Sequence, residues 1–513
     1  MHFLLLALAL AAPLPHDEAV ADVWHLTRLL EQSHPDPFLR GGGRVAFYQA
    51  VDDVIRGLPE GAIEPADLRD HLLPIVARVG DGHTSLAPVA ATTAPTALGL
   101  GLTPVDRTLV VTSVDHRDDR GLLGMAVVSV GGSSLDELLA RQDRVVGSDN
   151  DMHRLVRLAK RLSTGEGRDA VVEGPLAVDL VSVTGERTTY TPDPSRKPAK
   201  QPVTMDSRWD LPQPGPHDIA WTLLDDGTAY LRIASMMRYR EAFEIWRATG
   251  FDANLGDHLD RVAGAASKKL AADRDGRILQ VPSATETFQE LFAAMDREDV
   301  GSLVVDLRGN SGGNSALSLV LGLFLADGPT LRKAFADDGY QLRRFSELFH
   351  AAHTNAERPA GVPEGAYDFR VLHHSPSAEE QQEQLARYLG AMPTLKAAVD
   401  AGALRDGPPL RLKVLLDAGT YSAGFDLVRL LDALGAELVG VPSSQSGNCF
   451  IDSVPFHLQH SRLRGSMSTK WSVAYPDDPA RGLLLPVDTA LTWERWHELG
   501  FDPHAALTLA VDP

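Results

Sequence analysis

The spacing of apolar side chains divides the chain into stretches of different character. Within residues 18–90, apolar residues such as Leu26 and Leu30 recur at helical spacing, which predicts amphipathic helices. The sequence SHPDPF at 33–38 contains two prolines and predicts a break between helices. We therefore expect an N-terminal helical segment that carries the sequence GDGHTSL, at 80–86, near its end.

Residues 95–195 have a different pattern, with runs rich in β-branched side chains. LVVTSV at 109–114 and MAVVSVGG at 125–132 predict strands, the second ending in a glycine turn. SSLDELLARQ, which follows, predicts a short helix. The sequence PDPSRKPAKQP at 192–202 has the composition of a linker, and we place a linker over 196–218.

The remaining segment, 219–513, alternates short apolar strands with amphipathic helices. Strands are predicted at 225–235, in SLVVDLR from 302, at 413–417 and at 438–441, with helices between them. Parallel strands need such crossover connections. The sequence thus predicts an α/β (α+β multidomain) chain: a helical first segment, a β-rich middle module and an α/β domain with a mixed, largely parallel sheet. Residues 250–282 and 335–405 look like insertions into this domain.

The composition disfavours some classes of function but does not identify one. The 513 residues carry a net charge of −20, which disfavours binding to the phosphates of nucleic acid. Cys449 is the single cysteine, so the chain has no intrachain disulfide and no multi-thiolate metal site. The pairs His350/His353 and His373/His374 lack a third ligand at a suitable spacing. We expect neither a metal nor another cofactor.

The first residues, MHFLLLALALAAPLP, resemble an export signal. The apolar run from Phe3 to Ala12 has the length of a signal core and is followed by small residues, although no Lys or Arg precedes it. The alternative is an apolar first helix or a short anchor. No later stretch reaches the roughly 18 apolar residues of a membrane span. We expect a signal segment at 1–17 and an exported, periplasmic or extracellular chain without stable membrane insertion.

The sequence SLVVDLRGNSGGNS, 302–315, places a glycine-rich polar loop where a buried strand ends. It lacks the GK[ST] ending of a phosphate-binding loop and the spacing GxGxxG, so nucleotide binding is a poor fit. Glycines allow backbone N–H groups to turn outward and a substrate to approach closely. The alternative is a tight turn between a strand and a helix.

A second loop, AGTYSAG, follows the strand KVLLD and places Ser422 at the start of a helix. The carboxyl ends of parallel strands share one sheet edge, so both loops can face one site. An exposed serine there can act as a nucleophile, and the N–H of Ala423 with that of Gly312 or Gly313 would form an oxyanion hole. The alternative is that Ser422 caps its helix, a common role for serine.

A serine hydroxyl needs a general base at neutral pH. His83, in the sequence GDGHT, is the candidate, because it lies between a predicted helix end and a loop and a glycine precedes it. Taken alone, a histidine in a loop is unremarkable. Its assignment therefore depends on the other motifs.

Three motifs, GDGHTSL, VVDLRGNSGG and TYSAGFDLV, stand in this order and together resemble the tail-specific (carboxyl-terminal-processing) serine peptidase family. The resemblance extends to HLTRLLEQSHPDPF and to STKWSVAYPDDPARGLLLPVD at 468–488. One design of the family uses a Ser–Lys dyad, with the Lys about 25 residues after the Ser, but GVPSSQSGNCF in this region has no Lys. The chain therefore resembles the Ser–His design of the tricorn protease core.

The resemblance implies a serine endopeptidase that acts on peptide or protein substrates through an acyl-enzyme. Ser422 would be the nucleophile and His83 the general base. The acid that orients the histidine would lie in YPDDPARG, which makes Asp478 the first choice and Asp477 the substitute. This sequence has Asp where the family pattern has Glu, and Asp81, near His83, is a third candidate.

The middle region, 95–195, resembles a PDZ-like module, although it lacks a clear GLGF motif. Such modules bind a peptide C-terminus as an added strand, which here implies substrate docking. One alternative is a catalytically silent peptide- or lipophile-binding protein on the same scaffold. Another is an esterase, but the GxSxG elbow is absent around Ser422. The sequence does not determine the oligomeric state, the cleavage specificity, or whether residues 335–405 form a lid.

Overall fold

The computed structural model describes residues 12–89, 98–193, 195–196, 199–251, 255–335, 339–372, 377–405 and 409–511. The core of the expected export signal, up to residue 11, lies outside these ranges, as do His373 and His374. Leu14 is buried, and its N–H and C=O pair with those of Ile63. No helix in the described part of the chain is long and apolar enough to cross a membrane.

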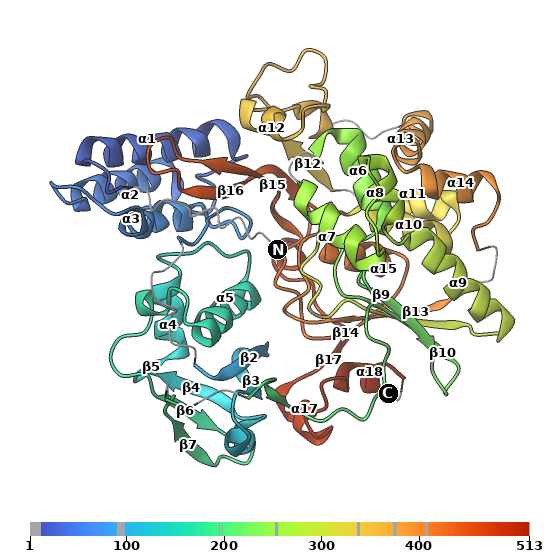
Figure 1. The fold of residues 1–513 in the computed structure, drawn as a ribbon, viewed down its shortest axis with the longest axis horizontal. Coiled ribbons are helices and arrows are strands. Elements are labelled where there is room, and N and C mark those ends of the chain that lie inside the picture. The colour runs from blue at the N-terminus through green and yellow to red at the C-terminus, as the bar shows by residue number, and fades with distance from the viewer. Residues whose placement is uncertain are drawn as a thin grey trace.

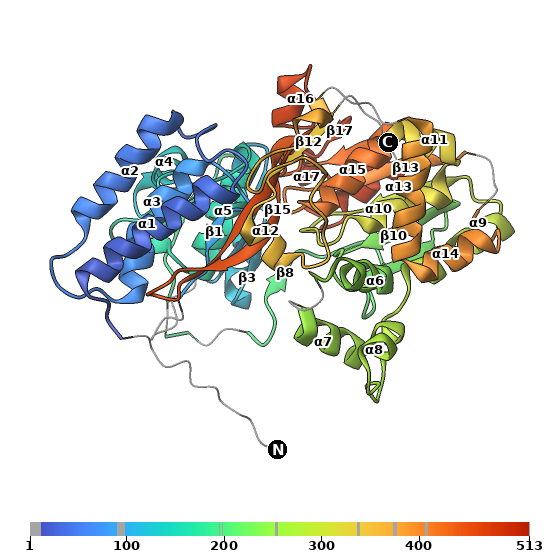
Figure 2. The same cartoon turned by 90° about the horizontal axis from the view of Figure 1, so that it is seen from above.

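The first unit of the fold is a layer of three helices. They are α1 (His16–Ser33), α2 (Gly43–Gly57) and α3 (Pro65–Val79). A long hairpin from the C-terminal part of the chain, β15 (Asn448–His457) and β16 (Arg464–Val473), reaches across these helices (Figures 1 and 2). Its Phe456 and Met467 share one apolar core with the helices, and β1 (Ser85–Leu86) pairs with β16. The hairpin therefore attaches the helical unit to the rest of the molecule.

The second unit is an antiparallel sheet with two helices. Its main strands are, in spatial order, β2 (Leu100–Val105), β3 (Thr108–Val114), β4 (Ala126–Val130), β6 (Val178–Val181) and β7 (Arg187–Tyr190), and β5 (Ser133–Ser134) and β8 (Val203–Thr204) pair at its sides. The helices are α4 (Leu135–Gln142) and α5 (Asp151–Thr164), with short 3-10 turns η1 (Arg117–Leu122) and η2 (Arg168–Ala170). The apolar face of α5, with Leu155 and Leu158, packs on the sheet. Strands form where β-branched runs predicted them.

The third unit contains a six-stranded sheet in the order β17-β14-β13-β11-β10-β9. The strands are β9 (Ile219–Leu223), β10 (Thr228–Ile233), β11 (Ser302–Asp306), β13 (Arg411–Leu416), β14 (Glu437–Gly440) and β17 (Thr489–Ala490). All neighbouring pairs are parallel except β9 with β10. The predicted α/β class with a mixed, largely parallel sheet is confirmed.

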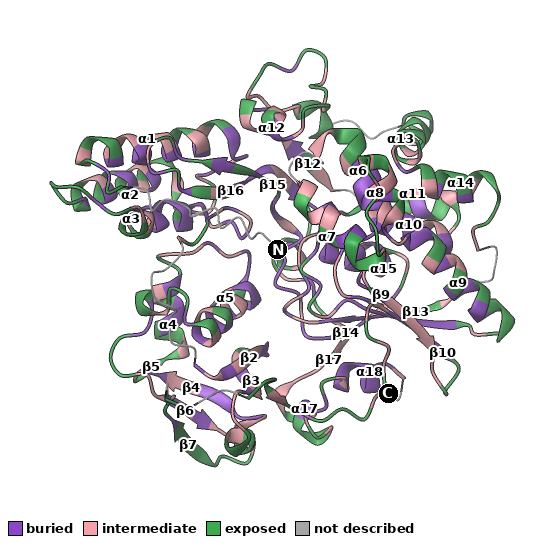
Figure 3. Ribbon diagram, in the orientation of Figure 1, coloured by how far each residue is buried: buried purple, intermediate pink, exposed green. Residues whose placement is uncertain are grey.

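Helices cover both faces of this sheet. One face packs against α6 (Arg240–Thr249), α9 (Ala284–Arg297), α10 (Ala316–Leu325), α11 (Gly328–Phe335) and α15 (Ala423–Ala433), and the other packs against α18 (Ala505–Val511). Val305 points to the first face and Val304 to the second, as expected for a strand buried on both sides. Figure 3 shows exposed residues on the outward sides of helices such as α9 and α14.

The two expected insertions contain regular structure. Residues 250–282 include α7 (Gly256–Ala266) and α8 (Arg274–Gln280). Residues 335–405 include β12 (Tyr340–Arg343), α12 (Glu347–Ala352), the 3-10 turn η4 (Phe369–Leu372), α13 (Ala378–Ala391) and α14 (Pro393–Asp400). β12 pairs with β16 and widens the hairpin sheet. Near the C-terminus lie α16 (Pro479–Leu483) and α17 (Trp493–Glu498).

Candidate active site

A buried ion pair supports the glycine loop that follows β11. The carboxylate of Asp306 accepts hydrogen bonds from Arg308 Nε and Nη2, at 2.9 and 2.7 Å, and from the Tyr230 hydroxyl, at 2.7 Å. Burial alone would raise the pKa of Asp306, but the charges of Arg308 and Arg232 and the hydrogen bonds outweigh burial and lower it. The charged pair at the strand end, DLR, is therefore an internal support for the loop.

Asn310 joins the glycine loop to the serine loop. Its backbone oxygen accepts the N–H of Tyr421 at 2.9 Å, and its side-chain oxygen accepts the N–H of Gly312 at 2.9 Å. The hydroxyl of Thr420 donates to the carbonyl of Leu307, also at 2.9 Å. The two loops, separated by more than 100 residues of sequence, thus meet at the carboxyl edge of the sheet.

Ser422 has a strained backbone conformation between β13 and α15. Its φ of 53° and ψ of −127° lie in a region that non-glycine residues rarely adopt, at a typical cost of roughly 1–3 kcal/mol. Although Ser422 is the N-cap residue of α15, its side chain makes no capping hydrogen bond. Its N–H donates to Gln445 Oε1 at 3.1 Å. The hydroxyl is therefore not used as a helix cap.

The predicted oxyanion-hole residues lie around Ser422. Gly312 is so close that a Cβ atom there would lie 2.7 Å from both Ser422 Cβ and Ala423 N. The Gly312 N–H is occupied by Asn310, whereas neither Gly313 nor Ala423 donates its N–H to another described residue. Gly312 therefore provides space, and the two N–H groups left for an anion are those of Gly313 and Ala423.

The structure brings His83 to Tyr421, the residue before Ser422. The two rings stack with centroids 4.7 Å apart and an angle of 25°. His83 Nδ1 lies 3.1 Å from the Tyr421 hydroxyl oxygen. The other ring nitrogen, Nε2, is buried and has no hydrogen-bond partner among the described residues. One side of the imidazole is thus anchored and the other is unoccupied.

The three carboxylates expected to orient His83 lie in different places. Asp81 is buried, and it accepts the backbone N–H of His83 at 2.8 Å and the Thr84 hydroxyl at 2.5 Å. Asp477 and Asp478 are exposed, and Asp478 accepts the N–H of Arg481 at the start of α16. Within the described ranges, no hydrogen bond or ion pair joins Asp478 to His83. The structure thus gives Asp478 a helix-capping contact instead.

Asp81 is held by a second histidine. His34 Nε2 lies 3.2 Å from its carboxylate, and both side chains are fully buried. Burial alone would raise the pKa of Asp81, but the hydrogen bond and charge of His34, the charge of His83 and the bond from Thr84 lower it overall. Asp81 therefore remains ionised and fixes the backbone of the loop that carries His83.

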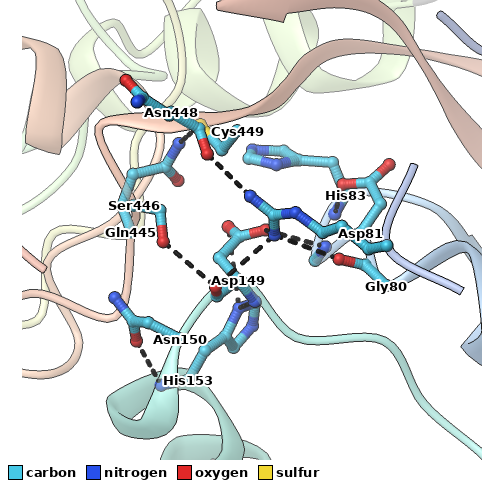
Figure 4. A network of polar contacts seen from close by, with 12 residues as sticks. Gly80, Asp81, His83, Asp149, Asn150, His153, Gln445, Ser446, Asn448 and Cys449 are labelled. Carbon is cyan, nitrogen blue, oxygen red and sulfur yellow. Dashed lines mark hydrogen bonds and ion pairs between the residues drawn. The ribbon is translucent and has the colours of Figure 1, made fainter. Parts of the chain in front are cut away.

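A fourth carboxylate, Asp149, was missed by the sequence analysis. It lies in the second unit between α4 and α5, and Figure 4 shows it between the His83 loop and His153. Its Oδ2 accepts the Tyr421 hydroxyl at 2.6 Å, and its Oδ1 accepts the Gly82 N–H at 3.1 Å. The sequence around it, GSDND, matches no motif, so only the three-dimensional contact identifies it.

Neighbouring side chains fix the charge state of this cluster. Arg157 Nε donates to His153 Nε2 at 3.0 Å, and the backbone N–H of Asp149 donates to His153 Nδ1 at 3.3 Å; the same Nδ1 lies 3.8 Å from Asp149 Oδ2. Burial lowers the pKa of His153, and the charge of Arg157 adds to this effect. Burial alone would raise the pKa of Asp149, but His153 and His83 lower it overall. Burial and the charge of Asp149 raise the pKa of Tyr421, which therefore keeps its proton.

We also compared the described residues with two other kinds of site, a metal centre and a Ser–Lys dyad. In the ranges that the structure describes, no three His, Cys, Asp or Glu side chains come together as metal ligands would. His350 and His353 instead stack on aromatic side chains. In the segment where a dyad lysine would lie, the residue that contacts Ser422 is Gln445, a neutral amide.

Comparisons with known proteins agree with this geometry. Residues 228–455, which contain both the glycine loop and Ser422, match the model of peptidase family S41. No curated protein matches the chain. Mature CPAF, 12% identical, aligns over 97% of this chain and 98% of its own with a TM-score of 0.53, and mature CPAF complexed with lactacystin, 14% identical, aligns over 97% and 99% with 0.52. These two structures show that the fold is shared over nearly the whole chain.

Proposed function

We propose that this chain, of which residues 228–455 match the model of peptidase family S41, is a serine-type peptidase that cleaves peptide bonds within protein substrates through an acyl-enzyme on Ser422. His83 is the general base. The observation that carries the proposal is a strained Ser422, whose hydroxyl does not cap its helix, next to Tyr421, on which the His83 imidazole stacks. The Nε2 of that imidazole has no hydrogen-bond partner among the described residues. Strain of this kind clusters at active sites.

The reaction follows from these positions. His83 Nε2 takes the proton of Ser422 Oγ as Oγ bonds to the carbonyl carbon, and the carbonyl electrons move to oxygen. The N–H groups of Gly313 and Ala423 stabilise this oxyanion, each by roughly 3 kcal/mol in the transition state. When the intermediate collapses, the C–N bond breaks and the leaving amine takes the proton from Nε2. A water molecule then hydrolyses the ester by the same route and returns the proton to Ser422.

The test is the substitution Ser422→Ala, with the exposed Ser195→Ala as the matched control. We expect hydrolysis of fluorescently labelled, denatured casein to fall by about 10⁴-fold or more with Ser422→Ala, because the nucleophile is lost. The unfolding temperature should not fall, and the control should keep full activity. Wild-type activity in Ser422→Ala would contradict the proposal.

A fluorophosphonate probe separates this proposal from a silent binding protein on the same scaffold. The probe should label wild-type protein at Ser422, as mass spectrometry of the modified peptide would show, because only an activated hydroxyl attacks phosphorus. Absence of labelling, together with absence of casein hydrolysis, would favour the carrier.

A further inference from the structure

We propose that Asp149 is the carboxylate that orients His83, and that it acts through the hydroxyl group of Tyr421. The inference rests on the proposed function, because it concerns how the general base is prepared. Asp149 and Tyr421 are positioning residues in this scheme. Neither was given a role in the sequence analysis, and Asp149 lies outside the segment that matches the family model.

The direction of each hydrogen bond follows from proton counting. An ionised carboxylate only accepts hydrogen bonds, so the single proton of the Tyr421 hydroxyl points to Asp149 Oδ2, 2.6 Å away. The same hydroxyl oxygen lies 3.1 Å from His83 Nδ1 and can only accept there. Nδ1 must therefore carry the ring proton and donate it to the tyrosine oxygen. In the neutral ring, this leaves a lone pair on Nε2.

This tautomer is the one that a general base needs. Nε2 must be unprotonated to take the proton of Ser422 Oγ, and its buried position, with no hydrogen-bond partner among the described residues, agrees with that role. When the ring becomes positively charged, the Nδ1–H bond to the tyrosine transmits the stabilisation by Asp149. The hydroxyl of Tyr421 thus does the work that a direct Asp–His contact does in other serine peptidases.

The surroundings of Asp149 hold its two oxygens in distinct roles. Oδ1 accepts the Gly82 N–H at 3.1 Å and lies 3.7 Å from the Arg40 guanidinium, whereas Oδ2 faces Tyr421. Arg40 itself donates to the carbonyls of Gly80 and Asn448. Because Oδ1 is surrounded by donors, the carboxylate cannot rotate without losing these bonds.

The decisive substitution is Asp149→Asn. The donors around Oδ1 require an oxygen at that position, so the new NH₂ group would face Tyr421. The tyrosine proton would then turn to His83 Nδ1, and the ring proton would move to Nε2, the wrong tautomer. We expect kcat to fall on the order of 1,000-fold or more, with KM little changed.

Tyr421→Phe removes the hydroxyl but keeps the ring that stacks on His83. The tautomer would then be unbiased rather than reversed, so kcat should fall about 10- to 100-fold, less than in Asp149→Asn. In the double variant, Asp149→Asn should have little further effect, because the connection is already broken. A merely structural role for Asp149 would instead give additive losses.

Two readouts separate the scheme from general damage. In ¹⁵N-histidine spectra of the Ser422→Ala protein, the His83 signal, assigned by its loss in His83→Gln, should show an unprotonated Nε2. Asp149→Asn in that background should shift it to a protonated Nε2. The pH profile of kcat is a second readout, and the charged groups that bear on it are Asp81, Asp149, His153, Arg40 and Arg157.

The controls are Asp151→Asn, an exposed neighbour, and Tyr388→Phe, an exposed tyrosine on α13, and both should keep wild-type kcat. Wild-type kcat in Asp149→Asn or in Tyr421→Phe, with Ser422→Ala inactive, would overturn the relay and leave the proposed function intact. Activity in Ser422→Ala would overturn the proposed function itself. Equal, additive losses in both variants with an unchanged His83 tautomer would also overturn the relay.

Discussion

The backbone of Ser422 is held by a bond from within one unit of the chain, whereas the loop that carries His83 is held by contacts from several parts of the molecule. The backbone N–H groups of Tyr421 and Ser422 are bonded to Asn310 and Gln445, both in the third unit, although the Tyr421 hydroxyl reaches Asp149 in the second. The His83 loop receives Asp149 from the second unit, Ser466 from the β15–β16 hairpin, and Asp81 from its own unit. The nucleophile is therefore built into a single sheet edge, and the base depends on how the units fit together. Three predictions test this difference.

The largest effect is expected for Asp306→Asn. This substitution leaves the Arg308 side chain, which is 14% exposed, without its ionised partner beneath the glycine loop, and losing one member of a largely buried pair costs about 3–5 kcal/mol. We expect urea denaturation to show that loss of unfolding free energy, together with loss of casein hydrolysis. Asp169→Asn, whose side chain is exposed, should change neither quantity. A change in unfolding free energy below about 1 kcal/mol would show that the loops around Ser422 do not depend on this pair.

A smaller effect, confined to the chemistry, is expected for Gly312→Ala. The added Cβ would lie 2.7 Å from Ser422 Cβ and Ala423 N, both of which are fixed, so the serine must shift. We expect kcat to fall by about 100-fold, since a 1 Å displacement can cost that much. Gly435→Ala is a matched control because Gly435 also has a positive φ, of 86°, but open space around it. Equal activity in both variants would contradict the close approach.

The smallest effect concerns the pH dependence of the unfolding free energy, through His153 beside the His83 loop. The folded pKa of His153 lies below its ordinary value of about 6.5, so its contribution to stability is complete above pH 6.5 and is lost as pH falls toward the folded pKa. We expect the unfolding free energy to decrease between pH 7.5 and 5.5, and the decrease to be smaller by at most about 1 kcal/mol in His153→Gln.

Urea denaturation at both pH values gives this comparison. The exposed His497→Gln should keep the wild-type difference between the two pH values. If His153→Gln loses as much unfolding free energy on acidification as the wild type, then His153 is not held neutral in the folded protein. The region around His83 would then be less sensitive to acid than we expect.

The sequence was sufficient where local patterns determine structure. The apolar runs at 302–306 and 411–416 became parallel neighbours, and the loops after them met at one edge, as the shared carboxyl edge of parallel strands requires. The sequence also identified His83 as a candidate base, because the order of the three motifs can be read directly from the chain. The resemblance to the tail-specific serine peptidase family is confirmed by the matching family model.

The sequence could not identify Asp149 or choose between Gly312 and Gly313. Asp149 acts through Tyr421, 272 residues away, and its place depends on how the second unit packs against the third. The two glycines, with φ values of 98° and 143°, differ in their contacts: the N–H of Gly312 donates to Asn310, whereas no described residue accepts that of Gly313. Asp478 was chosen by sequence position, whereas orientation of an imidazole requires contact.

The β15–β16 hairpin also bears on the order in which the enzyme is assembled. The helices that precede His83 complete their apolar core with Phe456, Leu458, Leu463 and Met467, and in the described part of the chain β1 pairs with β16 alone. On a ribosome, residues up to 473 must leave the exit tunnel before that core can close. In a nascent chain, the imidazole of His83 therefore reaches its final position only near the end of synthesis. Proteolytic activity then appears late, and a truncated product is inactive.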